Sequence, residues 1–173
     1  SEMSEEQRIA THRLLRASMS SQGYAKFAGI MRLEDQAHLD ALEQLNNNPD
    51  ARPIGQAFAD AYDSTNYAVA IFGNPGQENW GWKIAGHHAA VNFTVSNGRV
   101  GFTPTFLGSH PMIVQSGKHA GLMVLPQEGQ RGLELMQSLS AEKQDIAKIS
   151  DEKPRDVIEG PGRRASLSVF VGL

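Results

Sequence analysis

At 173 residues, the chain has the length of one ordinary domain and is long enough to bury a sizeable core. Hydrophobic residues make up 40% and charged residues 20%, which excludes wholesale disorder, and the net charge of -3 argues against an electrostatic nucleic-acid binder. No stretch approaches the roughly 18 apolar residues of a membrane span, and the absence of cysteine excludes disulfides, thiolate metal sites and a cysteine nucleophile.

The first part of the chain predicts an antiparallel pair of helices. Ser4 and Gln7 have the spacing of a capping box, and apolar residues then recur at roughly helical spacing up to Gly23, which predicts the helix end. A second helix is expected from Tyr24 to about Leu45, where one broad apolar stripe is followed by the breaker run Asn46–Pro49.

A short third helix is predicted over residues 54–62, and strands follow it. Tyr67–Phe72 has the composition of a buried strand closed by Gly and Pro. Trp82–Ser96 and Arg99–Phe106 predict two further strands joined by Asn97-Gly98, the strongest short hairpin signal.

The rest of the chain predicts one more strand, at Leu122–Leu125, and two helices. The helices are expected at Gln127–Leu139 and at Lys143–Ile149, the second with Ser140 as its N-cap. The predicted fold is a single α+β domain over residues 1–173: helical at 4–62, a small, mainly antiparallel sheet at 67–125, helical at 127–149, and an extended tail at 150–173. The tail ends on an apolar segment, Val169–Leu173, which we expect to need a partner.

Hairpin geometry predicts which side chains share a face. A type I′ turn at Asn97-Gly98 pairs Ser96 with Arg99, and side chains alternate between the two faces from there. One face is then the core, with His87, Ala89, Val91, Phe93, Val95, Val100, Phe102, Pro104 and Phe106. The other face carries Trp82, Ile84, His88, Ala90, Asn92, Thr94, Thr103 and Thr105.

This alternation separates His87 from His88, so the two cannot bind one ion from a regular strand. A bulge favoured by Gly86 would change this. Pro104 lacks an N–H and predicts that its strand reaches a sheet edge or kinks there. His87, at the end of an apolar face, is more often a hydrogen-bonded core histidine than a ligand.

The second face has two interpretations, which the sequence leaves open. One is a polar pocket lined by His88, Asn92, Thr103, Thr105, Trp80 and Trp82. The other is a solvated sheet face, because threonine is simply a good strand residue. His110 and His119 lie in later loops, either of which is able to fold back toward His88. Glu34 and His38 have the spacing of a helical ligand pair, for which a surface interaction is the better interpretation.

The hairpin region resembles a known family. The run Trp80-Gly-Trp-Lys-Ile-Ala-Gly-His-His88, then Asn92-Phe-Thr-Val95, then Thr103-Pro-Thr-Phe-Leu-Gly108, is similar to the bacterial and fungal family DUF3500, and the flanking segments agree. The resemblance brings no established activity. It implies a longer protein with a C-terminal segment rich in aromatic, Asn and His residues, which this chain lacks, so that a site shared with that segment would be only half present.

The resemblance also implies a role for the histidine pair. Imidazoles from two parts of a chain suit a divalent metal such as Zn, Cu or Fe. The leading hypothesis is a metal-dependent, hydrolase-like enzyme that uses His87 and His88 as ligands or acid/base groups, with Asn92 and Thr103 positioning a small-molecule substrate. The alternatives are a non-catalytic binding module, and structural histidines with an apolar C-terminus that docks a missing segment or a second copy of the chain. No signal peptide is expected in a chain that begins Ser-Glu-Met-Ser-Glu-Glu, and a soluble protein of either cytoplasmic or mature secreted origin fits.

Overall fold

One sheet and a helical layer carry the histidine pair. A computed structural model describes residues 3–48, 52–148 and 151. The chain divides into two compact units, Ser1–Leu125 and Pro126–Leu173. The elements of the first unit are α1 (Glu5–Ser18), α2 (Ser21–Asn47), α3 (Arg52–Ala61), the 3-10 turn η2 (Ser64–Asn66), β1 (Ala68–Gly73), β2 (Asn79–Ala85), β3 (Ala89–Ser96), β4 (Arg99–Gly101) and β5 (Thr105–Leu107).

The predicted helices are present within about two residues of their expected bounds, and the break between the first two is corrected. The Ser4 side chain and the Gln7 side chain form the expected capping box at the start of α1. The break between α1 and α2 falls at Met19 and Ser20 rather than at Gly23, because the Ser20 hydroxyl accepts the Gly23 N–H at 3.0 Å and caps α2 three residues earlier. Gly23 therefore lies in the first turn of α2.

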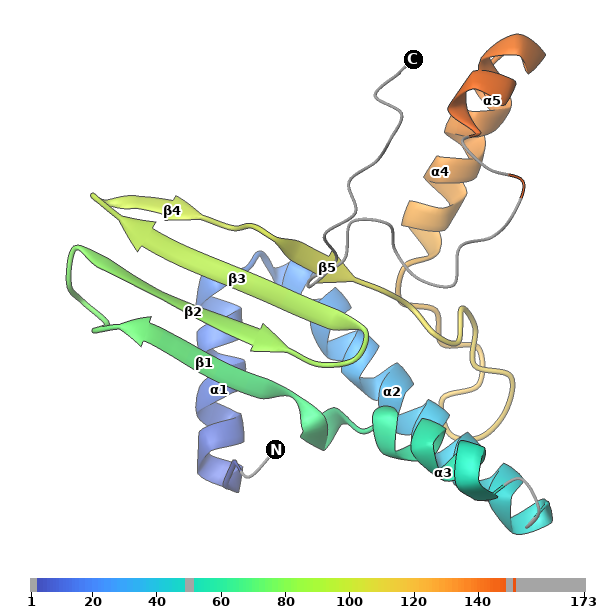
Figure 1. Ribbon diagram of the computed structural model, residues 1–173, viewed down its shortest axis with the longest axis horizontal. Helices are drawn as coiled ribbons and strands as arrows, with labels where there is room; N and C mark the ends of the chain where they lie inside the picture. Colours follow the sequence, from blue (N-terminus) through green and yellow to red (C-terminus); the bar gives the residue numbers. More distant parts are fainter. Residues whose placement is uncertain (1–2, 49–51, 149–150, 152–173) are drawn as a thin grey trace. The chain divides into compact units, whose positions relative to one another are not determined.

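The sheet is antiparallel throughout, in the order β1-β2-β3, with β4 and β5 both paired to the far side of β3 (Figure 1). Asn97 and Gly98 have positive φ angles of 51° and 71°, as a type I′ turn requires. Val95 pairs with Val100, as predicted. The α+β class is thus confirmed, with a mainly antiparallel sheet around this hairpin.

The predicted single strand Trp82–Ser96 is wrong. The chain turns after Ala85, and the two halves pair with each other as β2 and β3, so that Trp82 lies opposite Phe93. Trp82 is 2% exposed and belongs to the core face, not to the face of Asn92. The prediction failed because the turn lacks the Asn-Gly or Asp-Gly pair that is the usual sequence signal of a two-residue hairpin turn.

The register also slips by one residue beyond the turn at Asn97-Gly98. Thr105 pairs with Val91 and Phe106 with Ala90, whereas the uninterrupted hairpin would have paired Pro104 with Val91. Residues 102–104, with a cis bond before Pro104, interrupt the strand, which confirms the predicted kink. Phe106 is therefore on the outer face, and Thr105 is on the core side, the reverse of the prediction.

The core lies between the sheet and the helices α1 and α2, which cover one face of the sheet (Figure 1). Its buried members are Leu15, Phe27, Ile30, Tyr67, Trp82, Ile84, Ala89, Val91 and Phe93. Aromatic rings stack across the strands, with the Trp82 and Phe93 centroids 4.6 Å apart.

The second unit contains α4 (Pro126–Ser138) and α5 (Ala141–Ala147), and Ser140 caps α5 as predicted.

Leu122–Leu125 forms no strand, so that prediction is wrong. The tail expected at 150–173 lies outside the described residues except for Asp151. Among the helices that the structure describes, none is both long and apolar enough to cross a membrane.

Gly86 is required by the packing of the turn, because a Cβ atom there would overlap the buried ring of Tyr67. We expect Gly86→Ala to destabilise the protein by about 1–3 kcal/mol, the usual cost of overpacking. Chemical denaturation measures the change. Gly101→Ala is the matched control, since its nearest contact would be the Thr94 carbonyl at 3.9 Å. Equal stability of the two variants would contradict the prediction.

Candidate functional site

The histidine pair occupies the turn between β2 and β3. The Gly86 N–H donates to the Ala89 carbonyl at 2.8 Å, which makes His87 and His88 the two central residues of the turn. Turn residues do not obey strand alternation, and the two rings meet edge to face with centroids 4.5 Å apart. The prediction that put His87 in the core and His88 on the opposite face is therefore wrong: His87 is exposed, and the His88 side chain is 18% exposed.

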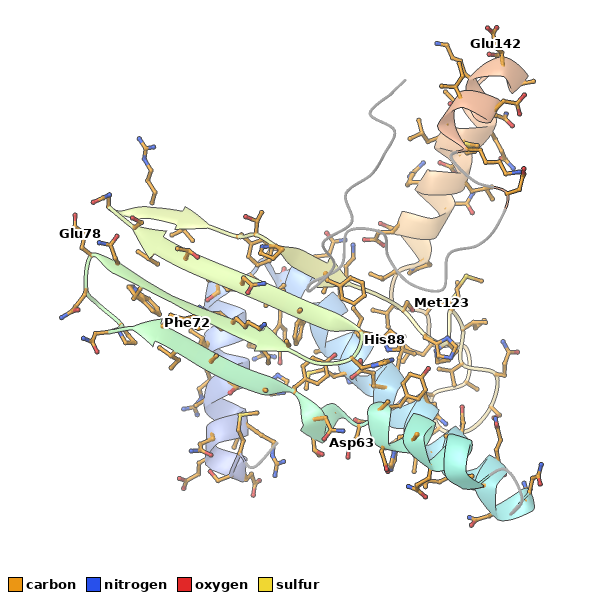
Figure 2. The ribbon with its side chains drawn as sticks, in the orientation of Figure 1. Asp63, Phe72, Glu78, His88, Met123 and Glu142 are labelled. Atoms are coloured by element: carbon orange, nitrogen blue, oxygen red, sulfur yellow. The ribbon has the colours of Figure 1, made fainter. Side chains whose placement is uncertain are left out.

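A buried carboxylate lies directly beneath this turn. Glu34, in the middle of α2, is 0% exposed. Its Oε1 accepts the His88 backbone N–H at 2.6 Å and lies 3.3 Å from His88 Nδ1. Figure 2 shows His88 at the end of the hairpin, where the turn lies close to α2. The expected surface pairing of Glu34 with His38 is wrong, because the Glu34 side chain faces the hairpin from inside the protein.

Two further polar residues of α2 form hydrogen bonds to the segment that carries Tyr62. Asp35 accepts the Ser64 N–H at 3.1 Å, and His38 Nδ1 lies 2.7 Å from the Ala59 carbonyl, to which it donates. These two bonds fix the end of α3 and the turn that follows it. Tyr62 lies between the two anchored positions.

The imidazole rings of three histidines contact the phenol ring of Tyr62. Its ring is nearly parallel to those of His88 and His110, at centroid distances of 5.6 and 5.7 Å, and meets His87 edge-on at 5.1 Å. His110 comes from the loop after β5, which is held where the Gly108 N–H donates to the His88 carbonyl at 2.7 Å. We call His87, His88, His110, Tyr62 and Glu34 the histidine cluster.

Sequence reasoning found part of this cluster. His87 and His88 were its central candidates, and His110 was one of two loop histidines able to approach them. Glu34 and Tyr62 were missed as site residues. The one signal for Glu34 is an acid within the apolar stripe of α2, where a buried charge requires a partner.

The remaining predicted site residues lie elsewhere. Asn92 donates its side-chain N–H to the Pro104 carbonyl at 2.7 Å, and the Thr105 hydroxyl donates to the Phe102 carbonyl at 3.1 Å. These bonds stabilise the link between β4 and β5, where Thr103 is exposed. Trp82 is in the core, and Trp80 lies half-buried on the same face, so no described contact joins either ring to the histidine cluster.

The electrostatics of the cluster favour a neutral His87. Although the residue is exposed overall, desolvation of its ring by nearby protein, followed by the neighbouring His88 imidazole, lowers the pKa of His87. A neutral imidazole has a lone pair for a proton or a metal ion. Within the described residues, however, no three His, Asp or Glu side chains are arranged to hold a metal.

Tyr67, just before β1, lies beside the same carboxylate. The residue is 1% exposed. Burial, followed by the negative charge of Glu34, raises the pKa of Tyr67 far above its usual range.

These features define an α+β protein with a histidine cluster between α2 and one end of an antiparallel sheet. The chain belongs to the DUF3500 family, described as "Protein of unknown function (DUF3500)", whose model matches residues 1–173. The resemblance expected from the hairpin motif is thereby confirmed. Comparison with curated proteins gave no match, and comparison with solved structures gave none either.

The raised pKa of Tyr67 predicts a loss of stability at high pH. In the unfolded chain the phenol ionises near its ordinary pKa of about 10, whereas in the folded protein it keeps its proton. Its stabilising contribution is therefore complete below about pH 10 and falls above it, by about 1.4 kcal/mol per pH unit. Tyr67→Phe should lack this decline.

Urea denaturation between about pH 9 and about pH 11.5 measures the difference. Tyr24→Phe is the control, because the Tyr24 hydroxyl contacts His12 at 3.2 Å, away from Glu34, and this variant should keep the wild-type slope. Parallel curves for wild type and Tyr67→Phe would rule the prediction out.

Proposed function

We propose that the chain is a hydrolase-like enzyme whose base is His88. The observation that carries the proposal is the buried Glu34 carboxylate beside Nδ1 of this half-buried imidazole. An ionised carboxylate has only acceptor atoms, so it favours the tautomer with the proton on Nδ1. Nε2 then carries the lone pair, which is the arrangement that a third group gives to a general base in catalytic triads.

The neighbours of His88 suit this role. The Tyr62 ring lies nearly parallel to the imidazole, with the two centroids 5.6 Å apart. His87 and His110 supply further imidazoles on the same side of the turn. In a hydrolysis, His88 Nε2 would take a proton from water as the water oxygen bonds to the electrophilic centre of the substrate, and the protonated imidazole would return that proton to the leaving group as its bond to that centre breaks.

A metal-dependent form of this enzyme uses the same histidines. His87 and His88 would be ligands of Zn, Cu or Fe, and Glu34 would orient His88, as carboxylates commonly do behind ligating histidines. A catalytic zinc site normally has three protein ligands, and the described residues provide no such set. The geometry therefore supports the base more strongly than the metal ligand.

The base is tested with a panel of chromogenic carboxylic esters, phosphate esters, glycosides and peptide anilides. For any substrate that the wild type hydrolyses, we expect His88→Gln to lower kcat by about 10²–10⁴-fold, the usual contribution of a general base. His119→Gln is the control, because His119 has no described contact with the cluster. Hydrolysis that continues unchanged in His88→Gln would refute the role of His88.

The metal form is tested by elemental analysis of the purified protein, His87→Ala and His88→Ala. A stoichiometric metal that is present in the wild type and lost in both variants would establish His87 and His88 as ligands. If the wild-type protein holds no stoichiometric metal after incubation with Zn, Cu and Fe, the metal-dependent form of the proposal is refuted. The proposed role of His88 as a base is not affected by that result.

A further inference from the structure

Three buried polar atoms that lack a hydrogen-bond partner surround one carboxylate. They are Glu34 Oε2, the Tyr67 hydroxyl and His88 Nδ1, and they are all such side-chain atoms found in the described part of the chain. Buried polar groups are nearly always hydrogen-bonded. Their concentration around Glu34 indicates one network with complementary donors and acceptors.

The surroundings of Tyr67 hold its ring in place and bury its hydroxyl. Phe27 packs edge-on against the ring at 5.7 Å, and the Gly86 backbone lies against the ring with no room for a side chain. With 1% of the residue exposed, the hydroxyl has no route to solvent. Because burial and the charge of Glu34 raise the pKa of Tyr67, the phenol keeps its proton and is a donor.

The donor count leaves one arrangement that satisfies all three groups. Glu34 Oε1 is engaged by the His88 backbone and lies against His88 Nδ1, whereas Oε2 has no hydrogen-bond partner in the described structure. The Tyr67 hydroxyl, close enough to Glu34 for the carboxylate to raise the pKa of Tyr67, is the unpartnered donor next to it. We infer that Tyr67 is a positioning residue: its hydroxyl donates to Glu34 Oε2, which holds Oε1 against His88 and keeps the imidazole proton on Nδ1. Its catalytic meaning rests on the proposed function, but the network itself is testable without any substrate.

The test reads the His88 tautomer directly. Nitrogen-15 shifts of the His88 ring are measured by long-range proton–nitrogen correlation, at a pH where the imidazole is neutral, and are assigned with His88→Gln. In the wild type, we expect Nδ1 at the position of a protonated nitrogen and Nε2 at that of an unprotonated one. In Tyr67→Phe, which keeps the ring and removes only the donor, Nδ1 should move downfield and Nε2 upfield as the other tautomer gains population.

Tyr24→Phe is the matched control, since it removes a different half-buried hydroxyl and should leave the His88 shifts unchanged. Wild-type shifts in Tyr67→Phe would overturn the inference and leave the proposed base intact. A wild-type His88 that is protonated on Nε2 would overturn the inference and also remove the support for the proposed function.

A measurement on the wild type covers the case in which Tyr67→Phe does not fold. The protein is labelled with carbon-13 at tyrosine Cζ and dissolved in equal parts of light and heavy water. A hydroxyl held by Glu34 exchanges slowly and gives Tyr67 two Cζ lines, one for each hydrogen isotope. A single averaged line would overturn the inference.

Discussion

The carboxylate of Glu34 connects the helical layer to the histidine turn, and much of the first unit depends on this contact. Removing an ion from water costs several kcal/mol unless nearby groups compensate it. Glu34 is fully buried, and the His88 N–H at 2.6 Å is its described hydrogen-bond partner. Moving the β2–β3 turn away from α2 would therefore leave the buried Glu34 carboxylate without this hydrogen-bond donor. Electrostatics, in addition to apolar packing, set the position of the turn.

The same helix aligns the other parts of the site. Asp35 and His38 hold the chain on either side of Tyr62, and the Tyr62 ring in turn lies against His88 and His110. Three segments, residues 59–64, the β2–β3 turn and the loop after β5, are thus positioned from one helix. Such support from well-packed elements is what keeps a small group of polar side chains in a fixed geometry.

The sequence predicted those elements whose signals are local. The capping box at Ser4 and the turn at Asn97-Gly98 each depend on a few adjacent residues, and both are present. The turn at Gly86–His88 was missed because histidines have no turn preference, and a continuous strand then assigned Trp82 to the wrong face. The register shift at Pro104 was also missed. One extra residue there places every later side chain on the opposite face.

The sequence singled out His87 and His88 but not the turn that they form, nor the residues that surround them. Glu34 meets His88 across 54 positions of chain. Its place in the apolar stripe of α2 indicates burial but does not identify the partner. Only the arrangement of α2 beneath the hairpin brings the carboxylate to the imidazole.

The position of Trp82 affects how binding to this protein is observed. The two tryptophans of the chain are both on β2 and both face the core, with Trp82 stacked on Phe93. Their fluorescence therefore reports whether the sheet is packed against the helices. It has no described contact through which to sense a molecule that arrives at the histidines. A ligand screen followed by tryptophan emission would detect unfolding and overlook binding, whereas signals from Tyr62 or the imidazoles themselves would register it.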